Sequence, residues 1–260
     1  MDLHLKDKVV IVTGGAKGIG EAIVLNLVNE GAIPVIVGRS SSASADLWSR
    51  INELGGKSHV INTELGRGDV CKNIVSEVFS EFGRIDGVVN NAGVNDGVGL
   101  VNGSPERFKD SVIFNLTHYY DLVHFAFPYL KESKGSIVNV SSKTALTGQG
   151  NTSGYAASKG AQLALTREWA VELAPYGIRV NAIVPSEVMT PQYESWVKTL
   201  GDPEETLARI TSRIPFEQRM TTSDEIAAMA VFLLSERSSH TTGQWLFVDG
   251  GYVHLDRAIS

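Results

Sequence analysis

Short runs of Val and Ile recur along this chain, and a longer amphipathic stretch separates most of them from the next. The runs are nearly continuous in apolar residues, as in strands that are covered on both faces, and none is joined to the next by a hairpin signal. Strands are predicted at Val9–Val12, Pro34–Val37, His59–Ile61, Gly87–Val89, Ser136–Val140, Arg179–Val184 and Trp245–Val248.

The intervening stretches have the apolar spacing of helices. Helices are predicted at Gly18–Glu30, Asp69–Phe82, Pro105–Leu130, Thr152–Ala174 and Ser223–Ser235, and the serines at 40–44 are expected to turn into a further one. This alternation predicts an α/β fold with right-handed crossovers, in which a doubly wound, Rossmann-type parallel sheet of seven strands carries helices on both faces. No shift in composition divides the chain, so residues 1–260 are expected to form a single domain.

Composition narrows the function classes. The single cysteine, Cys71, excludes an intramolecular disulfide framework, and the six histidines lack metal-ligand spacing, so no metal is expected. A net charge of −6 without Lys/Arg clusters argues against a nucleic-acid partner. We find neither an apolar run of the roughly 18 residues that a membrane span needs nor a signal-peptide core. A cytoplasmic enzyme without a membrane partner is therefore expected.

One connection is longer than the fold requires. Residues 186–215 carry two helical patterns where a short link would suffice, and they follow a predicted strand end. Long connections in compact domains are usually functional, and ligands of open α/β sheets bind beyond the carboxyl ends of the strands. We expect a substrate lid here; a packing insertion is the alternative.

A glycine-rich turn follows the first predicted strand. Its spacing is G-x-x-x-G-x-G over Gly14–Gly20, and it opens a helix. Such glycines allow a tight turn and close approach of backbone to a pyrophosphate, which the helix N-terminus then binds. A purely structural turn is the alternative. The residues expected to contact a dinucleotide here are Gly14, Lys17, Gly18, Ile19 and Gly20.

The end of the second predicted strand bears on cofactor choice. An acidic residue there would bind the adenosine ribose of NAD, but this chain has Gly38 followed by Arg39. Arg39 and Lys17 together suit the 2′-phosphate of NADP, since arginine pairs with phosphate oxygens. The alternative is that both are solvated surface charges. NADP is the expected cofactor, and NAD remains possible.

Tyr155 and Lys159 lie four residues apart near the start of a predicted helix and so share a face. The pKa of a free tyrosine is near 10, and a nearby ammonium favours the phenolate and lowers that pKa. Ser142, thirteen residues earlier, follows a strand and can direct its hydroxyl to the same spot. These three residues fit general acid–base chemistry.

With the glycine turn, these residues make the chain resemble the short-chain dehydrogenase/reductase family over essentially its whole length. Gly14–Gly20 with the preceding Thr matches that family's TGxxxGxG turn, and residues 90–93 match its NNAG segment. The resemblance implies that Ser142, Tyr155 and Lys159 are catalytic and that Asn115 holds a water in a proton relay. It also implies hydride transfer to or from a nicotinamide, with Tyr155 exchanging the hydroxyl proton.

The resemblance also implies further cofactor contacts. One departure is Ser186, which stands where the family usually has glycine after a proline, so backbone contacts to the nicotinamide could shift slightly. Beyond the glycine turn and Arg39, the implied contacts are Glu64, Leu65, Asn91, Ala92, Gly93, Tyr155, Lys159, Pro185, Val188 and Thr190.

Polar residues in four separate loops are expected to surround the reacting oxygen. A polyol needs several fixed hydrogen-bond partners, whereas a steroid or acyl chain needs apolar walls. The alternative is that polar residues dominate any loop. The candidate substrate contacts are Asn95, Asp96, Ser142, Lys143, Gln149, Asn151, Tyr155, Glu187 and Trp196.

Several strings, among them residues 90–97 and 141–170, are similar to those of the bacterial L-fucose dehydrogenases within this family. That similarity implies oxidation of the anomeric hydroxyl of L-fucose to a lactone, with L-galactose and D-arabinose as related substrates, and a homotetramer. The alternatives are a 3-oxoacyl-carrier-protein reductase or other carbonyl reductase, and a nucleotide-binding regulator without catalysis.

Overall fold

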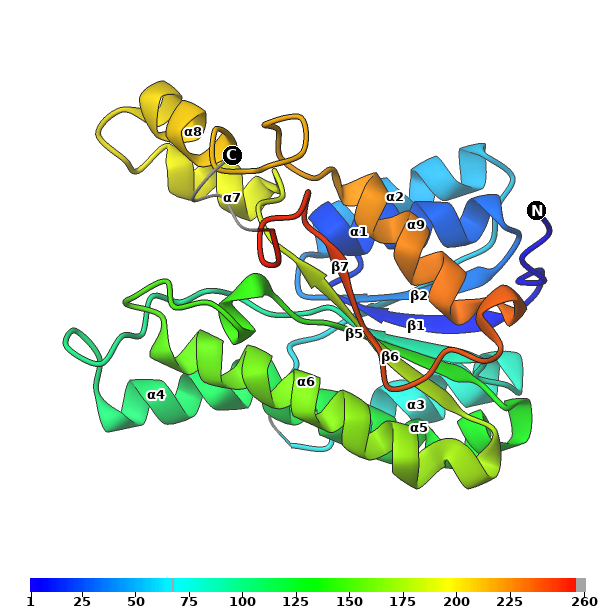
Figure 1. Ribbon diagram of the computed structural model, residues 1–260. Helices are drawn as coiled ribbons and strands as arrows, with labels where there is room; N and C mark the ends of the chain where they lie inside the picture. Colours follow the sequence, from blue (N-terminus) through cyan, green and yellow to red (C-terminus); the bar gives the residue numbers. More distant parts are fainter. Residues whose placement is uncertain (67, 256–260) are drawn as a thin grey trace.

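The computed structural model describes residues 1–66 and 68–255, and it contains one seven-stranded sheet. The strand order is β3-β2-β1-β4-β5-β6-β7, and each neighbouring pair is parallel (Figure 1). The strands are β1 (Val9–Thr13), β2 (Ile33–Gly38), β3 (His59–Asn62), β4 (Gly87–Asn90), β5 (Ser136–Val140), β6 (Arg179–Pro185) and β7 (Trp245–Val248). The predicted doubly wound parallel sheet is confirmed.

Helices cover both faces of the sheet (Figure 1). Those on one side are α1 (Gly18–Asn29), α2 (Ser41–Glu53) and α9 (Ser223–Leu234); those on the other are α3 (Val70–Phe82), α4 (Pro105–Val112), α5 (His118–Ser133) and α6 (Ser153–Leu173). Alternate residues of β1 enter two different cores, with Val10 and Val12 packing towards α1 and Val9 and Ile11 towards α3 and α5. This two-sided burial is why the strand sequences are continuously apolar.

The stretch predicted as one helix at Pro105–Leu130 is interrupted, so that prediction is wrong in detail. A π-helical turn, η1 (Ile113–Thr117), separates α4 from α5, and α5 continues to Ser133. Two side chains donate hydrogen bonds to backbone carbonyls in this turn: Thr117 Oγ1 donates to Ile113 O at 2.8 Å, and Asn115 Nδ2 donates to Ser111 O at 2.9 Å. Such π turns are frequent at functional sites, and this one carries a candidate catalytic residue, Asn115.

The serine-rich segment does turn into a helix, as expected: Ser40 caps α2 by accepting from Ala43 N. Short 3₁₀ turns follow three of the larger elements: η2 (Lys143–Ala145), η3 (Ala174–Tyr176) and η4 (Glu236–Ser238). Among the helices that the structure describes, none combines the length and apolar composition needed to cross a bilayer.

The long connection after β6 holds two helices, α7 (Pro191–Val197) and α8 (Pro203–Thr211), as its two helical patterns predicted. They stand beyond the carboxyl ends of the strands (Figure 1). We refer to residues 186–215 as the α7–α8 segment. Its base is fixed where Val188 bridges to Thr221, which also donates through Oγ1 to Val248 O at 3.4 Å.

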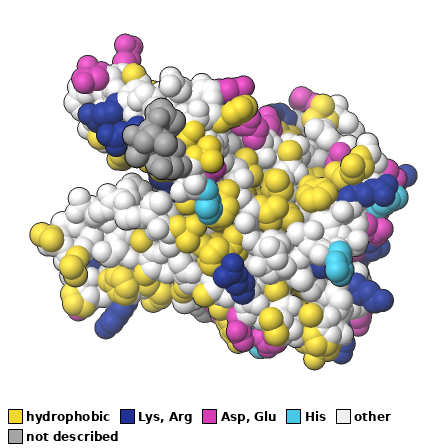
Figure 2. All heavy atoms as spheres, in the orientation of Figure 1, with side chains coloured by type: hydrophobic (Ala, Val, Ile, Leu, Met, Phe, Trp, Pro, Cys, Tyr) yellow, Lys and Arg dark blue, Asp and Glu magenta, His cyan; other side chains and the backbone are white. Residues whose placement is uncertain are grey.

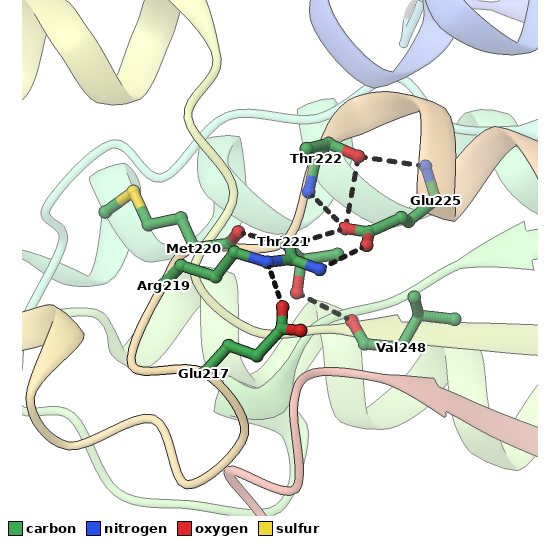
Figure 3. A network of polar contacts seen from close by, with 7 residues as sticks. All are labelled: Glu217, Arg219, Met220, Thr221, Thr222, Glu225 and Val248. Carbon is green, nitrogen blue, oxygen red and sulfur yellow. Dashed lines mark hydrogen bonds and ion pairs between the residues drawn. The ribbon is translucent and has the colours of Figure 1, made fainter.

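An arginine network lies just past the α7–α8 segment (Figure 3). Arg219 donates to Glu217 Oε2 at 2.6 Å and to Glu225 Oε1 at 2.7 Å. Glu225 also completes the capping box of α9 with Thr222. This network fastens the chain that leaves the α7–α8 segment to the start of α9.

Candidate active site

The glycine-rich turn between β1 and α1 has the geometry that its sequence predicts. Gly14 and Gly18 have φ values of +64° and +58°, which L side chains rarely adopt. A Cβ on Gly20 would lie 2.1 Å from Gly14 O, so backbone and helix approach too closely for any other residue. Asn91, just after β4, steadies the turn by donating to Thr13 O at 3.0 Å and Gly14 O at 3.3 Å.

This turn opens onto the point where the strand order reverses between β1 and β4, the usual ligand crevice of such sheets. The helix cap residue, Lys17, makes no side-chain bond to the helix, which is consistent with an N-terminus that can bind an anion. Ala92 and the exposed Gly93 continue the floor beside it. The cradle therefore fits a nicotinamide dinucleotide, the cofactor that the fold implies.

The adenosine end of the crevice holds an ion pair that the sequence did not predict. Arg39 Nη1 lies 3.5 Å from Glu64 Oε1, with both side chains well exposed. A carboxylate beside Arg39 offsets part of the positive charge that favours a 2′-phosphate. Arg39 and Glu64 are thus brought together, while Lys17 is exposed at the turn and Leu65 is half-buried.

The predicted catalytic residues converge at the carboxyl end of β5. Ser142 follows β5, and its hydroxyl is hydrogen-bonded to Tyr155, in the first turn of α6. Lys159 lies one turn further along α6, with its Nζ 5.5 Å from the centre of the Tyr155 ring. Tyr155 remains partly exposed, whereas Ser142 and Lys159 are buried. A reacting oxygen at Tyr155 would therefore meet two hydroxyls, one of them positioned to exchange a proton.

Burial shifts the pKa values of Tyr155 and Lys159. It raises the pKa of Tyr155 to about 12, although the hydrogen bond from Ser142 acts in the opposite direction. Burial also lowers the pKa of Lys159 to about 7. The lowered tyrosine pKa expected from the sequence is therefore not observed. Desolvation of Tyr155 outweighs its hydrogen bond with Ser142, and desolvation of Lys159 leaves the ammonium only partly charged near neutral pH.

Asn115 lies in the π turn and is fully buried. Its Oδ1 accepts from Val94 N at 2.7 Å and would lie 3.1 Å from a Cβ on Gly93, so the side chain holds the NNAG segment. Its backbone carbonyl accepts from Gln162 Nε2 at 2.8 Å. The Asn115 side chain thus has a structural role, which is to hold the loop at Val94, and its main-chain carbonyl is hydrogen-bonded to Gln162 of α6.

Two candidate substrate residues form an ion pair beside Ser142. Lys143 Nζ contacts Glu187 Oε1, and only 11% and 12% of the two side chains are exposed. The ammonium also lies 4.0 Å from the centre of the Tyr252 ring. Tyr193, on α7, donates to Glu187, and burial together with that carboxylate raises the pKa of the phenol. Four side chains from three separate segments thus meet at one neutral, polar cluster, which we call the Lys143–Glu187 cluster.

The other candidate substrate residues are less closely engaged. Asn95 and Asp96 bond to nearby backbone, at Gly97 N and Val98 N, and so shape their own loop. Gln149 and Asn151 are exposed. Trp196 is 44% exposed and packs edge-on against Tyr193 with ring centres 5.2 Å apart. Of these residues, Trp196 is connected to the Lys143–Glu187 cluster through Tyr193, and these contacts do not connect the other four to it.

The chain after β6 lines the same opening. Ser186, at the departure from the family pattern, donates to Asp249 O at 3.3 Å. Pro185 and Val188 are buried, and Thr190 caps α7. A Cβ on Gly18 would lie 3.3 Å from Thr190, so the α7–α8 segment touches the glycine turn. Figure 2 shows a deep notch between the lobe that carries α7 and α8 and the lobe below it.

Three residues near the site were not predicted: Tyr119, Gln162 and Tyr252. Tyr252 lies four residues after the last residue of β7, at the carboxyl end of the sheet, and this placement is the signal that could have predicted its approach to the site. Tyr119 and Gln162 lie inside helical patterns and carry no distinguishing local signal. Among the described residues, no group of three or more His, Cys, Asp or Glu is arranged to hold a metal ion.

Comparison with known proteins supports an oxidoreductase site. A family model described as enoyl-(acyl carrier protein) reductase matches residues 14–253. The chain is 37% identical over 253 residues to the 3-oxoacyl-(acyl-carrier-protein) reductase FabG of Thermotoga maritima, covering 96% of this chain and 100% of that protein. It is 38% identical over 245 residues to the L-fucose dehydrogenase of Mus musculus, covering 94% and 88%.

Solved structures agree with this assignment of fold. A crystal structure of Cj0485 dehydrogenase matches with a TM-score of 0.94 and 45% identity, covering 100% of this chain and 99% of that one. A ligand-free aldohexose dehydrogenase of Thermoplasma acidophilum matches with a TM-score of 0.89 and 32% identity, again over 100% and 99%.

Proposed function

The chain belongs to the short-chain dehydrogenase/reductase family, and we propose that it oxidises the anomeric hydroxyl of L-fucose, and of the related L-galactose and D-arabinose, to the lactone. The observation that carries this proposal is the Lys143–Glu187 cluster beside Ser142. A paired ammonium and carboxylate offer a donor and an acceptor to neighbouring hydroxyls without net charge. An acyl chain or a steroid would cover this polar pair without offering a hydrogen bond to its remaining donors and acceptors, which is costly.

In this proposal Tyr155 takes the proton of the anomeric hydroxyl, and Ser142 holds the same oxygen by a hydrogen bond. Lys159 favours the phenolate of Tyr155 and, with Asn115 nearby, completes the catalytic group. A bound NADP or NAD would supply the hydride acceptor, held by the glycine turn, the NNAG segment and residues 185–190. The protein's part is to orient the sugar and to move the proton.

The cofactor preference is a separate part of the proposal. Arg39 and Lys17 favour the 2′-phosphate of NADP, and Glu64 opposes it by pairing with Arg39. We expect NADP to be preferred by a modest factor, with NAD also used. By resemblance we also expect a homotetramer in the cytoplasm.

A second candidate is a 3-oxoacyl-carrier-protein reductase, because FabG of Thermotoga maritima is as similar as the L-fucose dehydrogenases. The phosphorylated arm of a carrier protein would need basic residues near the pocket, whereas the Lys143–Glu187 cluster is neutral overall. A regulator that binds the nucleotide without catalysis would not need Ser142, Tyr155 and Lys159 together.

The test is reduced-nicotinamide absorbance with purified protein. The panel combines NADP or NAD with L-fucose, L-galactose, D-arabinose or D-glucose, and adds an acetoacetyl thioester in the reducing direction. Turnover of L-fucose that is abolished in Tyr155→Phe supports the proposal. Turnover of the thioester alone would assign the reductase activity instead, and cofactor binding with no turnover of any substrate would refute the sugar assignment.

A further inference from the structure

A second tyrosine hydroxyl lies next to the proposed catalytic lysine, Lys159. Tyr119, in the first turn of α5, is fully buried. Its hydroxyl is 3.2 Å from Val140 O and 3.4 Å from Lys159 Nζ, and Lys159 Nζ is itself 2.7 Å from Val140 O. The three polar atoms form a closed triangle in which the ammonium donates to both oxygens and the phenol donates to the carbonyl.

Packing alone does not account for this hydroxyl. The ring of Tyr119 fills space in a core of Val, Leu and Ala side chains, where a phenylalanine ring would occupy the same volume. Placing a hydroxyl there is costly unless it is hydrogen-bonded. Its partners are the ammonium of Lys159, the Val140 carbonyl that the lysine also uses, and the side chain of Gln162. The hydroxyl is therefore joined to the proposed catalytic lysine and not only to the core.

We propose that Tyr119 is a positioning residue that fixes the ammonium of Lys159 and favours its charged form, so that Lys159 can in turn favour the phenolate of Tyr155. This inference rests on the catalytic role proposed for Lys159 and is independent of which alcohol is the substrate. Tyr119 contacts neither substrate nor cofactor in this scheme.

The electrostatic surroundings of Lys159 make such help necessary. Burial lowers the pKa of Lys159 to about 7, so its charge is only partly retained at neutral pH. The titratable groups that face it are Tyr155 on α6 and Tyr119 and His118 on α5. Burial and the nearby Lys159 lower the pKa of His118 to about 4, so His118 is neutral above pH 6. Burial raises the pKa of Tyr119, so its hydroxyl keeps its proton.

Replacing the hydroxyl should therefore alter a pH profile and not merely a rate. In Tyr119→Phe the ammonium loses one acceptor, its pKa falls, and the phenolate of Tyr155 is favoured less. The limb on which kcat/KM rises with pH, set by the ionisation of Tyr155, should move up by about 0.5–1 pH unit. In consequence kcat/KM at pH 7 should fall about 3- to 10-fold, the range that one hydrogen bond to a charged group allows. The matched control is Tyr120→Phe, since Tyr120 is the next residue on α5 and is 53% exposed.

The pH profile is measured from pH 6 to 10 with any alcohol that the wild-type protein oxidises. A measurement without substrate accompanies it: the protein is labelled with ¹³Cε-lysine, the Lys159 signal is identified by its loss in Lys159→Met, and its titration is followed by NMR. A lower lysine pKa in Tyr119→Phe supports the inference even if every sugar proves inactive.

Identical profiles and titrations for Tyr119→Phe and wild type would overturn the inference. The inference would also be overturned if Tyr119→Phe lowered kcat/KM by the same factor in the Lys159→Met variant as in the wild type, because the hydroxyl would then not act through Lys159. If Tyr119→Phe fails to fold, 3-fluorotyrosine at position 119 keeps the hydroxyl as a weaker acceptor. The titration should then shift in the same direction by less, and no shift would refute the proposal.

Discussion

Breaking the Lys143–Glu187 ion pair should destabilise the fold far more than breaking an ion pair on the surface. Removing one partner of a fully buried pair costs roughly 3–5 kcal/mol, because the other charge stays buried and unpaired. Here about a tenth of each side chain is exposed, and Lys143 keeps the face of Tyr252 at 4.0 Å. We therefore expect Glu187→Gln to lower the free energy of unfolding by about 2–3 kcal/mol.

The same helical segment provides a matched control. Glu194 and Lys198 on the α7–α8 segment form an exposed pair at 2.7 Å, so Glu194→Gln should change the free energy of unfolding far less than Glu187→Gln does. Urea unfolding at one protein concentration gives both values. Lys143→Met combined with Glu187→Gln should cost less than the two single changes added together, by about 1–3 kcal/mol.

Glu187→Gln should also raise KM for the sugar while leaving cofactor binding unchanged, because the cluster is proposed to hold substrate hydroxyls. Equal losses of stability in Glu187→Gln and Glu194→Gln, or strictly additive costs in the Lys143 and Glu187 cycle, would refute the reasoning that the pair is a coupled, desolvated unit.

Three further predictions concern the cofactor turn and the proposed catalytic lysine. Gly20→Ala places a Cβ 2.1 Å from Gly14 O, so dinucleotide affinity, measured by fluorescence titration, should fall about 10-fold or more with a stability loss of about 1–3 kcal/mol; unchanged affinity would contradict the cradle. Glu64→Gln should raise the ratio of NADP to NAD turnover and Arg39→Met should lower it, as steady-state kinetics would show; equal ratios would place both charges outside the ribose site. Because burial lowers the pKa of Lys159 to about 7, the folded state binds fewer protons than the unfolded state above that pH, and stability gains about 1–2 kcal/mol between pH 7 and 8.5 from this group. Urea midpoints should show that gain in the wild type and a flatter pH dependence in Lys159→Met; parallel curves would contradict it.

The sheet was predictable because strands that are buried on both faces consist mainly of apolar residues. Val9–Val12 is apolar without interruption, and Arg179–Val184 is interrupted only by Arg179 and Asn181. Each prediction differs from the observed strand by a single residue at one end. The glycine turn was equally predictable, because the Cβ of any other residue at position 20 would lie 2.1 Å from Gly14 O. Local sequence fixes these features because local sterics and burial cause them.

Features that depend on distant partners were not predictable. The π turn at Asn115 follows from side chains that bond to backbone one turn away, which the helical pattern around it does not reveal. Lys143 and Glu187 are 44 residues apart, and Lys159 and Tyr119 are 40 apart, so their contacts exist only once the sheet has assembled. The sequence indicated Lys143 and Glu187 as polar loop residues but not as a pair.

The most direct test of the central claim follows the hydride itself. L-Fucose carrying deuterium at C1 is incubated with the protein and NADP, and the reduced nucleotide is examined by NMR and mass spectrometry. Oxidation at the anomeric carbon predicts one deuterium on the nicotinamide ring, a slower rate than with unlabelled sugar when hydride transfer limits turnover, and L-fuconolactone as product. Reduced nucleotide without deuterium, or none at all while an acetoacetyl thioester is reduced, would contradict it.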